Sequence, residues 1–404
     1  MLERTMIPVI KKNSKHFPVL LLTGMRQIGK STLFEMLKDP GRKYVSLDSF
    51  DDRELARNNP ALFIQKYEPP VIIDEVQYAP ELFTYIKIYI DSHKKDRDFW
   101  LTGSQKYELM KGIQESLAGR VAILDMLGFS YKEIIKKPYE SKPFIPSMEM
   151  IKLNFKAKKL MEVYKIIWEG SYPRLITHKG ENRDTFYKSY LQSYIERDVR
   201  NNLNIRGNEL KFHNFIRAIA IRTATLLNYA DISKEIGIDQ RTVKVWMSML
   251  ERSGIIKLLE PYYRNPTNSI VKTPKIYFLD TGLCSYLAKM NSPEILEAGY
   301  MDGRILETYA FIEILKSYWH NGKEPNVYFY RDKAQNEIDF IIEDGGVLYP
   351  IEVKKTAIPS KNDIKNFFLL KQFKLKVGTG VVICLRHEAL PIDNNTLALP
   401  IWEI

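Results

Sequence analysis

Cysteine is nearly absent from this sequence, and long apolar runs are absent altogether. Of the 404 residues only Cys284 and Cys384 are cysteines, far apart and each beside apolar neighbours, which argues against disulfides and thiolate metal sites and favours a reducing compartment. The six histidines are scattered and indicate no metal cluster. No run approaches the ~18 residues of a membrane span, and no signal peptide is recognisable. We therefore expect a cytoplasmic protein with no membrane association.

The overall composition is that of an ordinary globular protein with a basic surplus. Hydrophobic residues make up 45% and charged residues 27%, and the length predicts two to four domains. The formal net charge is +11. A basic surplus favours a polyanionic partner such as DNA but does not identify one.

A phosphate-binding loop is the strongest motif in the chain. Gly24-x-x-x-x-Gly29-Lys30-Ser31 follows the apolar run Val19 to Leu22 and precedes a helical pattern, which is the strand-loop-helix context of the Walker A pattern GxxxxGK(S/T). Glycines let backbone N–H groups surround a phosphate, the lysine supplies a positive charge, and the serine hydroxyl can bind Mg²⁺. We expect nucleotide contacts from six residues: Gly24, Arg26, Gly29, Lys30, Ser31 and Thr32.

A second motif has the Walker B form. The apolar strand Val71 to Ile73 runs into Asp74 and Glu75. Two carboxylates at a strand end are costly unless a cation or hydrogen bonds compensate them. We therefore predict that Asp74 binds Mg²⁺ and that Glu75 orients or deprotonates the attacking water.

The neighbouring segments complete a predicted parallel α/β sheet. Strand candidates at 44–47, 99–101 and 121–124 alternate with helical patterns. At the end of the strand that includes Leu101, Ser104, or alternatively Thr102, is expected to reach the γ-phosphate or the water. Arg120 is interpreted either as a catalytic arginine or as a surface residue at a helix end.

Four stretches together resemble the AAA-like ATP-binding proteins of bacteria and archaea. They are Gly-Met-Arg-Gln-Ile-Gly-Lys-Ser from Gly24, Ile-Ile-Asp-Glu-Val-Gln from Ile72, Leu-Thr-Gly-Ser-Gln from Leu101 and Leu-Ala-Gly-Arg from Leu117. The resemblance implies an AAA+ (additional-strand) P-loop NTPase with one strand between the loop strand and the Walker B strand. It also implies ATP and Mg²⁺ as cofactors and a fused C-terminal domain of unknown function. Met25 departs from the proline expected in this loop.

Downstream of a predicted ATPase domain over 1–135 we expect a helical lid or linker over 136–200. Within it Arg174 and Arg197 are candidates either to close over the nucleotide or to form ordinary salt bridges. Residues 201–285 resemble a winged helix-turn-helix, with Gly237 at the turn and Asp239 capping a second helix. That helix presents Arg241 and Lys244 outward, so the module is predicted either to bind DNA or to make protein contacts.

The last predicted domain, 286–404, resembles the PD-(D/E)xK nuclease fold, a small restriction-endonuclease-like α/β unit. Glu307 lies on a helical segment, Asp339 on a strand, and Glu352 and Lys354 on the next strand. The resemblance implies that the three carboxylates bind Mg²⁺ and that Lys354 helps to activate water.

Together these patterns predict a magnesium-dependent ATPase with a C-terminal module that acts on DNA. The alternative is a nucleotide-switched protein-binding module whose nuclease-like domain is inactive. Assembly into a homo-oligomeric ring, with Arg120 acting on a neighbouring subunit, is a third interpretation.

Overall fold

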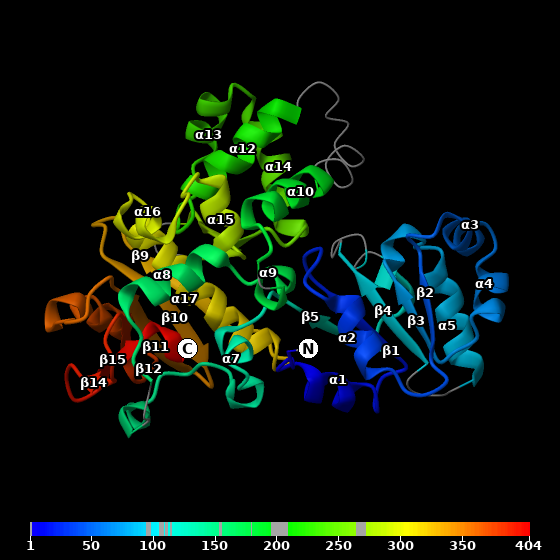
Figure 1. Ribbon diagram of the computed structural model, residues 1–404. Helices are drawn as coiled ribbons and strands as arrows, with labels where there is room; N and C mark the ends of the chain where they lie inside the picture. The colour runs from blue at the N-terminus through cyan, green and yellow to red at the C-terminus, as the bar shows by residue number, and fades with distance from the viewer. Residues whose placement is uncertain are drawn as a thin grey trace.

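The chain folds into an N-terminal α/β layer and a larger C-terminal body, which lie side by side in the computed structural model (Figure 1). None of the helices among the described residues is both long and apolar enough to cross a membrane. The structure describes residues 2–93, 98–104, 109, 112–113, 115–152, 156–178, 180–194, 209–263 and 272–404.

A five-stranded parallel sheet, in the order β2-β3-β4-β1-β5, forms the centre of the N-terminal layer. Its inner strands β1, β3 and β4 are buried along their whole length, as expected when helices cover both faces of a parallel sheet. Strand β4 lies between β1 and β3, so the predicted strand order is confirmed. The strands are β1 (Val19–Thr23), β2 (Lys43–Ser46), β3 (Val71–Asp74), β4 (Phe99–Gly103) and β5 (Val121–Asp125).

Helices pack on both faces of this sheet, and successive residues of β1 enter two separate apolar clusters. Side-chain caps fix where two of the helices begin, because Ser49 and Asn59 accept hydrogen bonds from backbone N–H groups of the first turn. The helices are α1 (Ile7–Asn13), α2 (Lys30–Leu37), α3 (Phe50–Asn58), α4 (Pro60–Lys66), the 3₁₀ turn η1 (Val76–Tyr78) and α5 (Leu82–His93).

A helical segment connects the sheet to the C-terminal body. It begins with a capping box in which the Ser130 hydroxyl and the Glu133 carboxylate each accept a backbone N–H of the other residue. The predicted lid region contains helices, but Arg197 lies outside the described residues. The elements are α7 (Tyr131–Ile134), η2 (Pro138–Glu140), η3 (Met148–Lys152), α8 (Leu160–Glu169), α9 (Pro173–Thr177) and α10 (Arg183–Tyr194).

Two helices joined by a tight turn follow, together with a small antiparallel sheet of order β6-β8-β7. Gly237 makes the turn in the left-handed region (φ 68°), and Asp239 caps the second helix through the N–H of Thr242. We call residues 209–263 and 272–278 the helix-turn-helix module; residues 264–271 of the predicted winged helix-turn-helix lie outside the described residues. Its elements are α12 (Glu209–Ile221), β6 (Thr225–Leu226), α13 (Tyr229–Ile236), α14 (Gln240–Arg252), β7 (Ile256–Leu259) and β8 (Lys275–Phe278).

The C-terminal sheet runs in the order β14-β15-β13-β11-β10-β9, with β12 paired to β11. A tight turn at Gly345 and Gly346, both at positive φ, joins the antiparallel strands β10 and β11. The long helix α17 packs against this sheet and is buried along most of its length. The elements are α15 (Thr281–Leu287), α16 (Pro293–Ala298), α17 (Asp302–Trp319), β9 (Val327–Arg331), β10 (Glu337–Asp344), β11 (Val347–Val353), η5 (Lys361–Ile364), η6 (Phe367–Phe373), β12 (Lys376–Val377), β13 (Gly380–Cys384), β14 (Leu390–Pro391), β15 (Thr396–Pro400) and η7 (Ile401–Glu403).

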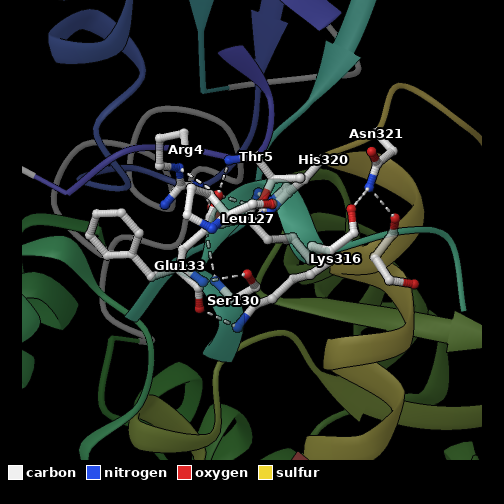
Figure 2. A network of polar contacts seen from close by, with 12 residues as sticks. Arg4, Thr5, Leu127, Ser130, Glu133, Lys316, His320 and Asn321 are labelled. Atoms are coloured by element: carbon white, nitrogen blue, oxygen red, sulfur yellow. Dashed lines mark hydrogen bonds and ion pairs between the residues drawn. The ribbon is translucent and has the colours of Figure 1, made fainter. Parts of the chain in front are cut away.

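A buried polar network joins the N-terminal layer to α17 (Figure 2). Glu133 accepts the backbone N–H of Thr5 (2.7 Å) and lies 3.5 Å from the Arg4 guanidinium. Arg4 also donates to the carbonyl of Leu127, whose own N–H donates to Nε2 of His320 at the end of α17. Three segments distant in sequence therefore meet through buried polar groups, and the two charges among them, on Arg4 and Glu133, are costly unless each finds a partner.

His320 is neutral in this network. Burial, together with the nearby Arg4 and Lys316 cations, holds the pKa of His320 well below its ordinary value. Because Nε2 accepts the Leu127 N–H, the single ring proton lies on Nδ1, 3.6 Å from the Glu133 carboxylate.

We predict that acid destabilises the protein through His320. The unfolded chain takes up a proton near pH ~6.5 while the folded chain does not, so the free energy of unfolding falls as pH drops below that value, by up to about 1.4 kcal/mol per pH unit. The free energy of unfolding, measured with denaturant between pH 7.5 and 5, should fall less steeply with decreasing pH in His320→Gln than in wild type. The same substitution at the exposed His387 is the control. Equal slopes for wild type and His320→Gln would contradict the prediction.

Candidate functional site

The phosphate loop connects β1 to α2, and its shape depends on two glycines. Gly24 has φ 144°, and a Cβ there would lie 2.1 Å from the carbonyl oxygen of Met126. Gly29 has φ 88° and immediately precedes α2. Both positions are strained for any other residue, which explains why the motif requires glycine there.

Lys30 is buried and its ammonium points into the loop. Nζ donates to the backbone carbonyls of Gly24 (3.0 Å) and Met25 (2.7 Å). Thr32 lines a cavity on the outer side of the loop. Arg26 points toward η1, where its guanidinium donates a hydrogen bond to the Tyr78 hydroxyl (3.3 Å). A phosphate in the loop would offer the ammonium charged oxygens in exchange for two neutral carbonyls, which is a stronger interaction.

Asp74, at the carboxyl end of β3, lies beside the loop and accepts hydrogen bonds from three hydroxyl groups. Ser31 donates from the first turn of α2 (2.6 Å), Tyr44 from β2 (3.1 Å) and Thr102 from β4. The Asp74 carboxylate raises the pKa of the Tyr44 hydroxyl, after the larger effect of burial. The structure thus brings Ser31 and Asp74 together as the sequence predicts, while Tyr44 was not predicted, because its strand carries no recognisable motif.

Glu75 has a left-handed backbone (φ 56°), which is uncommon outside glycine and is often found at functional sites. Its carboxylate accepts hydrogen bonds from the Gln77 amide and from the Ser104 hydroxyl (3.3 Å), and its N–H donates to Thr102 (3.3 Å). Ser104 and Thr102 were alternatives for one polar role. The structure places both at the site, Ser104 against Glu75 and Thr102 against both acids.

The donor set around Asp74 fits Mg²⁺. This ion prefers oxygen ligands and is usually held by one or two protein groups together with water and substrate phosphates. Ser31 and Asp74 offer a hydroxyl and a carboxylate 2.6 Å apart. Among the described residues no group of three or more His, Cys, Asp or Glu side chains is arranged to hold a metal ion by itself.

A cavity of about 680 Å³ opens on the outer side of the phosphate loop. Lys30, Ser31 and Thr32 lie on one wall, and helix α9 with Arg174 lies on another. The Arg174 guanidinium is 3.2 Å from Glu181, so the predicted lid arginine lines the cavity and is also ion-paired. The volume is sufficient for a nucleotide.

Arg120 is the one predicted catalytic residue that the structure leaves away from the loop within this chain. It precedes β5 at the amino end of the sheet, where its carbonyl accepts the N–H of Val19, whereas the loop leaves the carboxyl end of β1. Strand geometry puts the two ends roughly 15 Å apart. Its guanidinium pairs with Asp91 at the surface (2.8 Å).

The acids of the predicted second metal site, Glu307, Asp339 and Glu352, each lie beside a lysine. Asp339 and Glu352 interact directly, and Lys354 donates to Glu352 (2.7 Å). Glu307 accepts a hydrogen bond from the ammonium of Lys275 (3.0 Å). Lys275 belongs to β8, and the sequence interpretation did not include it. Burial raises the pKa of Glu307 to about 7, and burial with the neighbouring Asp339 raises the pKa of Glu352.

The predicted DNA-contacting residues Arg241 and Lys244 are exposed on α14, as the sequence pattern indicates. Lys244 lies over the ring of Tyr229, 5.5 Å from its centroid. The far end of the same helix faces the ATPase-like layer. There Ser248 and Arg252 line a cavity of about 420 Å³ whose other wall includes Ser104.

Comparison with known families agrees with this architecture. Residues 16–135 match the family described as "AAA domain". Residues 161–294 and 302–404 match two families described only as domains of unknown function, DUF8612 and DUF4143.

Two relatives match along most of the chain, and both are named only as uncharacterized proteins. One, from Mycobacterium tuberculosis, is 23% identical over 391 residues, which is 96% of this chain and 81% of that protein. Another, from Methanocaldococcus jannaschii, is 24% identical over 340 residues, 80% of this chain and 72% of that one.

Two solved structures are only distantly similar. The Holliday junction branch migration motor RuvB of Thermotoga maritima is 16% identical with a TM-score of 0.30, covering 65% of this chain and 86% of that one. A signal transduction ATPase with numerous domains from Pyrococcus horikoshii is 11% identical with a TM-score of 0.28, covering 80% and 47%. No conclusion on function rests on either. The family matches show that this chain carries an AAA-type, P-loop ATPase-like domain and ends in a domain of a family without known function.

Proposed function

We propose that this protein binds and hydrolyses ATP with Mg²⁺, and that the nucleotide state alters how its C-terminal half engages DNA. The observation that carries the proposal is the 2.6 Å contact between Ser31 and Asp74. It joins the two predicted Mg²⁺ ligands directly beside the buried ammonium of Lys30.

Each side chain of the site has a distinct role in this proposal. Lys30 would exchange the Gly24 and Met25 carbonyls for phosphate oxygens, and Ser31 and Asp74 would hold the ion. Bound Mg²⁺ supplies positive charge that offsets the charge developing on the phosphates. Glu75 would accept a proton from the attacking water, while Gln77 and Ser104 keep its carboxylate in one orientation.

The contacts of Met25 support coupling between the nucleotide and the C-terminal half. This loop residue is buried and accepts a hydrogen bond from the Tyr172 hydroxyl through its sulfur (3.7 Å). A Cβ placed on Gly254, just after α14, would lie 3.2 Å from the Met25 side chain. A movement of the loop on phosphate binding would therefore shift the contacts of Met25 with Tyr172, before α9, and with Gly254 of the helix-turn-helix module.

DNA is the partner that we propose for the helix-turn-helix module. Arg241 and Lys244 are exposed on one helix that follows a tight turn, which is a geometry suited to a major groove. The net charge of +11 favours the same class of partner. The alternative, a nucleotide-switched protein-binding module, is favoured by the Lys275 ammonium among the C-terminal acids, because it leaves no evident metal site there.

Two substitutions separate nucleotide binding from hydrolysis. We expect Lys30→Ala to abolish MgATP binding in calorimetric titrations, because the buried ammonium that points into the loop is lost. Glu75→Gln should bind ATP but lower its turnover by about 10²–10⁴, since the amide cannot accept a proton. Glu81→Gln, at an exposed acid nearby, is the control. Full turnover by the Glu75 variant would show that the base is misassigned.

DNA affinity should depend steeply on salt. Phosphate contacts make log K fall linearly with log salt, so Arg241→Ala or Lys244→Ala should each reduce the magnitude of that slope by about 1. The exposed Lys234, on α13, provides the control substitution. If fluorescence anisotropy detects no DNA binding at ~50 mM salt, the protein-binding alternative is favoured instead.

Arg120→Ala should leave ATP turnover unchanged, because the guanidinium lies at the opposite end of the sheet and an exposed ion pair is worth about 0–1 kcal/mol. Asp91→Ala breaks the same pair but keeps the arginine, which makes it a matched control. If Arg120→Ala alone lowers ATP turnover by ~10³–10⁵-fold and ATP-dependent oligomers appear in sizing experiments, Arg120 acts on a neighbouring subunit.

A further inference from the structure

The cluster of acidic residues in the C-terminal domain surrounds a lysine ammonium of the same chain, that of Lys275. Lys275 starts β8, at the centre of the small sheet of the helix-turn-helix module, and its side chain is almost fully buried. Side chains on a strand alternate between faces, so Lys275 and Tyr277 point the same way, and both contact Glu307. An otherwise apolar buried strand thus presents one ammonium and one hydroxyl to helix α17.

The ammonium lies among three carboxylates. Its distance to Glu307 is 3.0 Å, it forms an ion pair with Glu337, and it is 4.0 Å from Asp339. The predicted nuclease site would need a divalent ion bound by Glu307, Asp339 and Glu352. Here Lys275 holds Glu307 directly and lies 4.0 Å from Asp339, while Glu352 accepts a hydrogen bond from Lys354.

Other groups of the protein also donate hydrogen bonds to these acids and to Glu352. Glu337 accepts from Arg331 (2.5 Å), Asp339 accepts the N–H of Val353 (2.8 Å), and Glu352 accepts from Lys354 (2.7 Å). A small ion such as Mg²⁺ requires close octahedral oxygen contacts and tolerates no ammonium among its ligands. These acids therefore do not fit the metal that the nuclease-like fold implies.

The cavity beside the cluster has no surplus of negative charge. It has a volume of about 750 Å³, lies between the helix-turn-helix module and the C-terminal sheet, and has Lys275, Arg331, Asp231 and Glu337 as its charged lining residues. Its lining therefore does not attract a cation by net charge.

We propose that the Lys275 ammonium is the permanent cation of this cluster. It fastens the helix-turn-helix module to the C-terminal sheet, and the cluster binds no divalent metal and cleaves no phosphodiester. The domain keeps the acids and the lysine of a nuclease-like arrangement but uses them as a buried ionic joint between two parts of the chain. This inference is independent of ATP hydrolysis at the N-terminal site.

Counting bound Mn²⁺ tests the first half of the proposal. Full-length protein carrying Asp74→Asn, which removes the acid of the nucleotide site, is titrated with Mn²⁺ without nucleotide, and free ion is measured by electron paramagnetic resonance. We expect no tightly bound Mn²⁺, whether or not Asp339→Asn is added. One ion per chain that Asp339→Asn removes would overturn the proposal.

Thermal unfolding tests the second half. Lys275→Met keeps the length of the side chain but removes the buried cation that Glu307 and Glu337 share, so we expect the Tm to fall by about 10 °C. Lys272→Met, at an exposed lysine just before β8, should change it little. Adding Glu307→Gln to Lys275→Met should recover part of the loss. Equal Tm values for the two lysine variants would overturn the proposal, and if Lys275→Met does not fold, the Mn²⁺ count decides.

Discussion

Asp74 is a carboxylate in a place nearly closed to water, and the organisation of the nucleotide site follows from how that charge is accommodated. Burying a carboxylate without partners is strongly unfavourable. Here the hydroxyls of Ser31, Tyr44 and Thr102 share the two oxygens. They come from a helix and two strands, so the acid ties the phosphate loop to the sheet. The two proposed Mg²⁺ ligands, Ser31 and Asp74, are consequently held 2.6 Å apart.

The nucleotide site is physically continuous with the C-terminal body. Met126 touches the loop at Gly24, and Leu127, in the same segment, joins the buried network that ends at His320 on α17. Glu307, on the same helix, accepts a hydrogen bond from Lys275 of the helix-turn-helix module. Buried polar contacts near both ends of α17 thus join three parts of the molecule.

Local motifs predicted what depends on neighbouring residues in sequence. The loop, the Walker B acids and the strand order follow from apolar runs, glycines and the family resemblance, and each agrees with the structure. Tyr44 and Gln77 were missed as partners of Asp74 and Glu75, because a hydrogen bond from another strand or around a tight turn has no periodic signal. Arg120 was open to two interpretations because its ion-pair partner, Asp91, lies 29 residues earlier on a helix and leaves no local signal in the sequence.

The C-terminal acids illustrate the same limit more sharply. Their order along the chain correctly places Asp339 and Glu352 on adjacent strands, but the cation among them comes from a strand about 60 residues upstream, by the count from Lys275 to Asp339. A lysine in a buried apolar strand is the one available signal, since such a charge is almost never buried without a partner. Identifying that partner requires the tertiary fold.

A crystal structure with Mg²⁺ and a non-hydrolysable ATP analogue tests the central claim most directly. The account predicts that the Lys30 ammonium leaves the Gly24 and Met25 carbonyls for the outer phosphate oxygens, with Ser31 and Asp74 next to the ion. A nucleotide bound elsewhere, or a loop in which Lys30 keeps both carbonyl contacts, would contradict it.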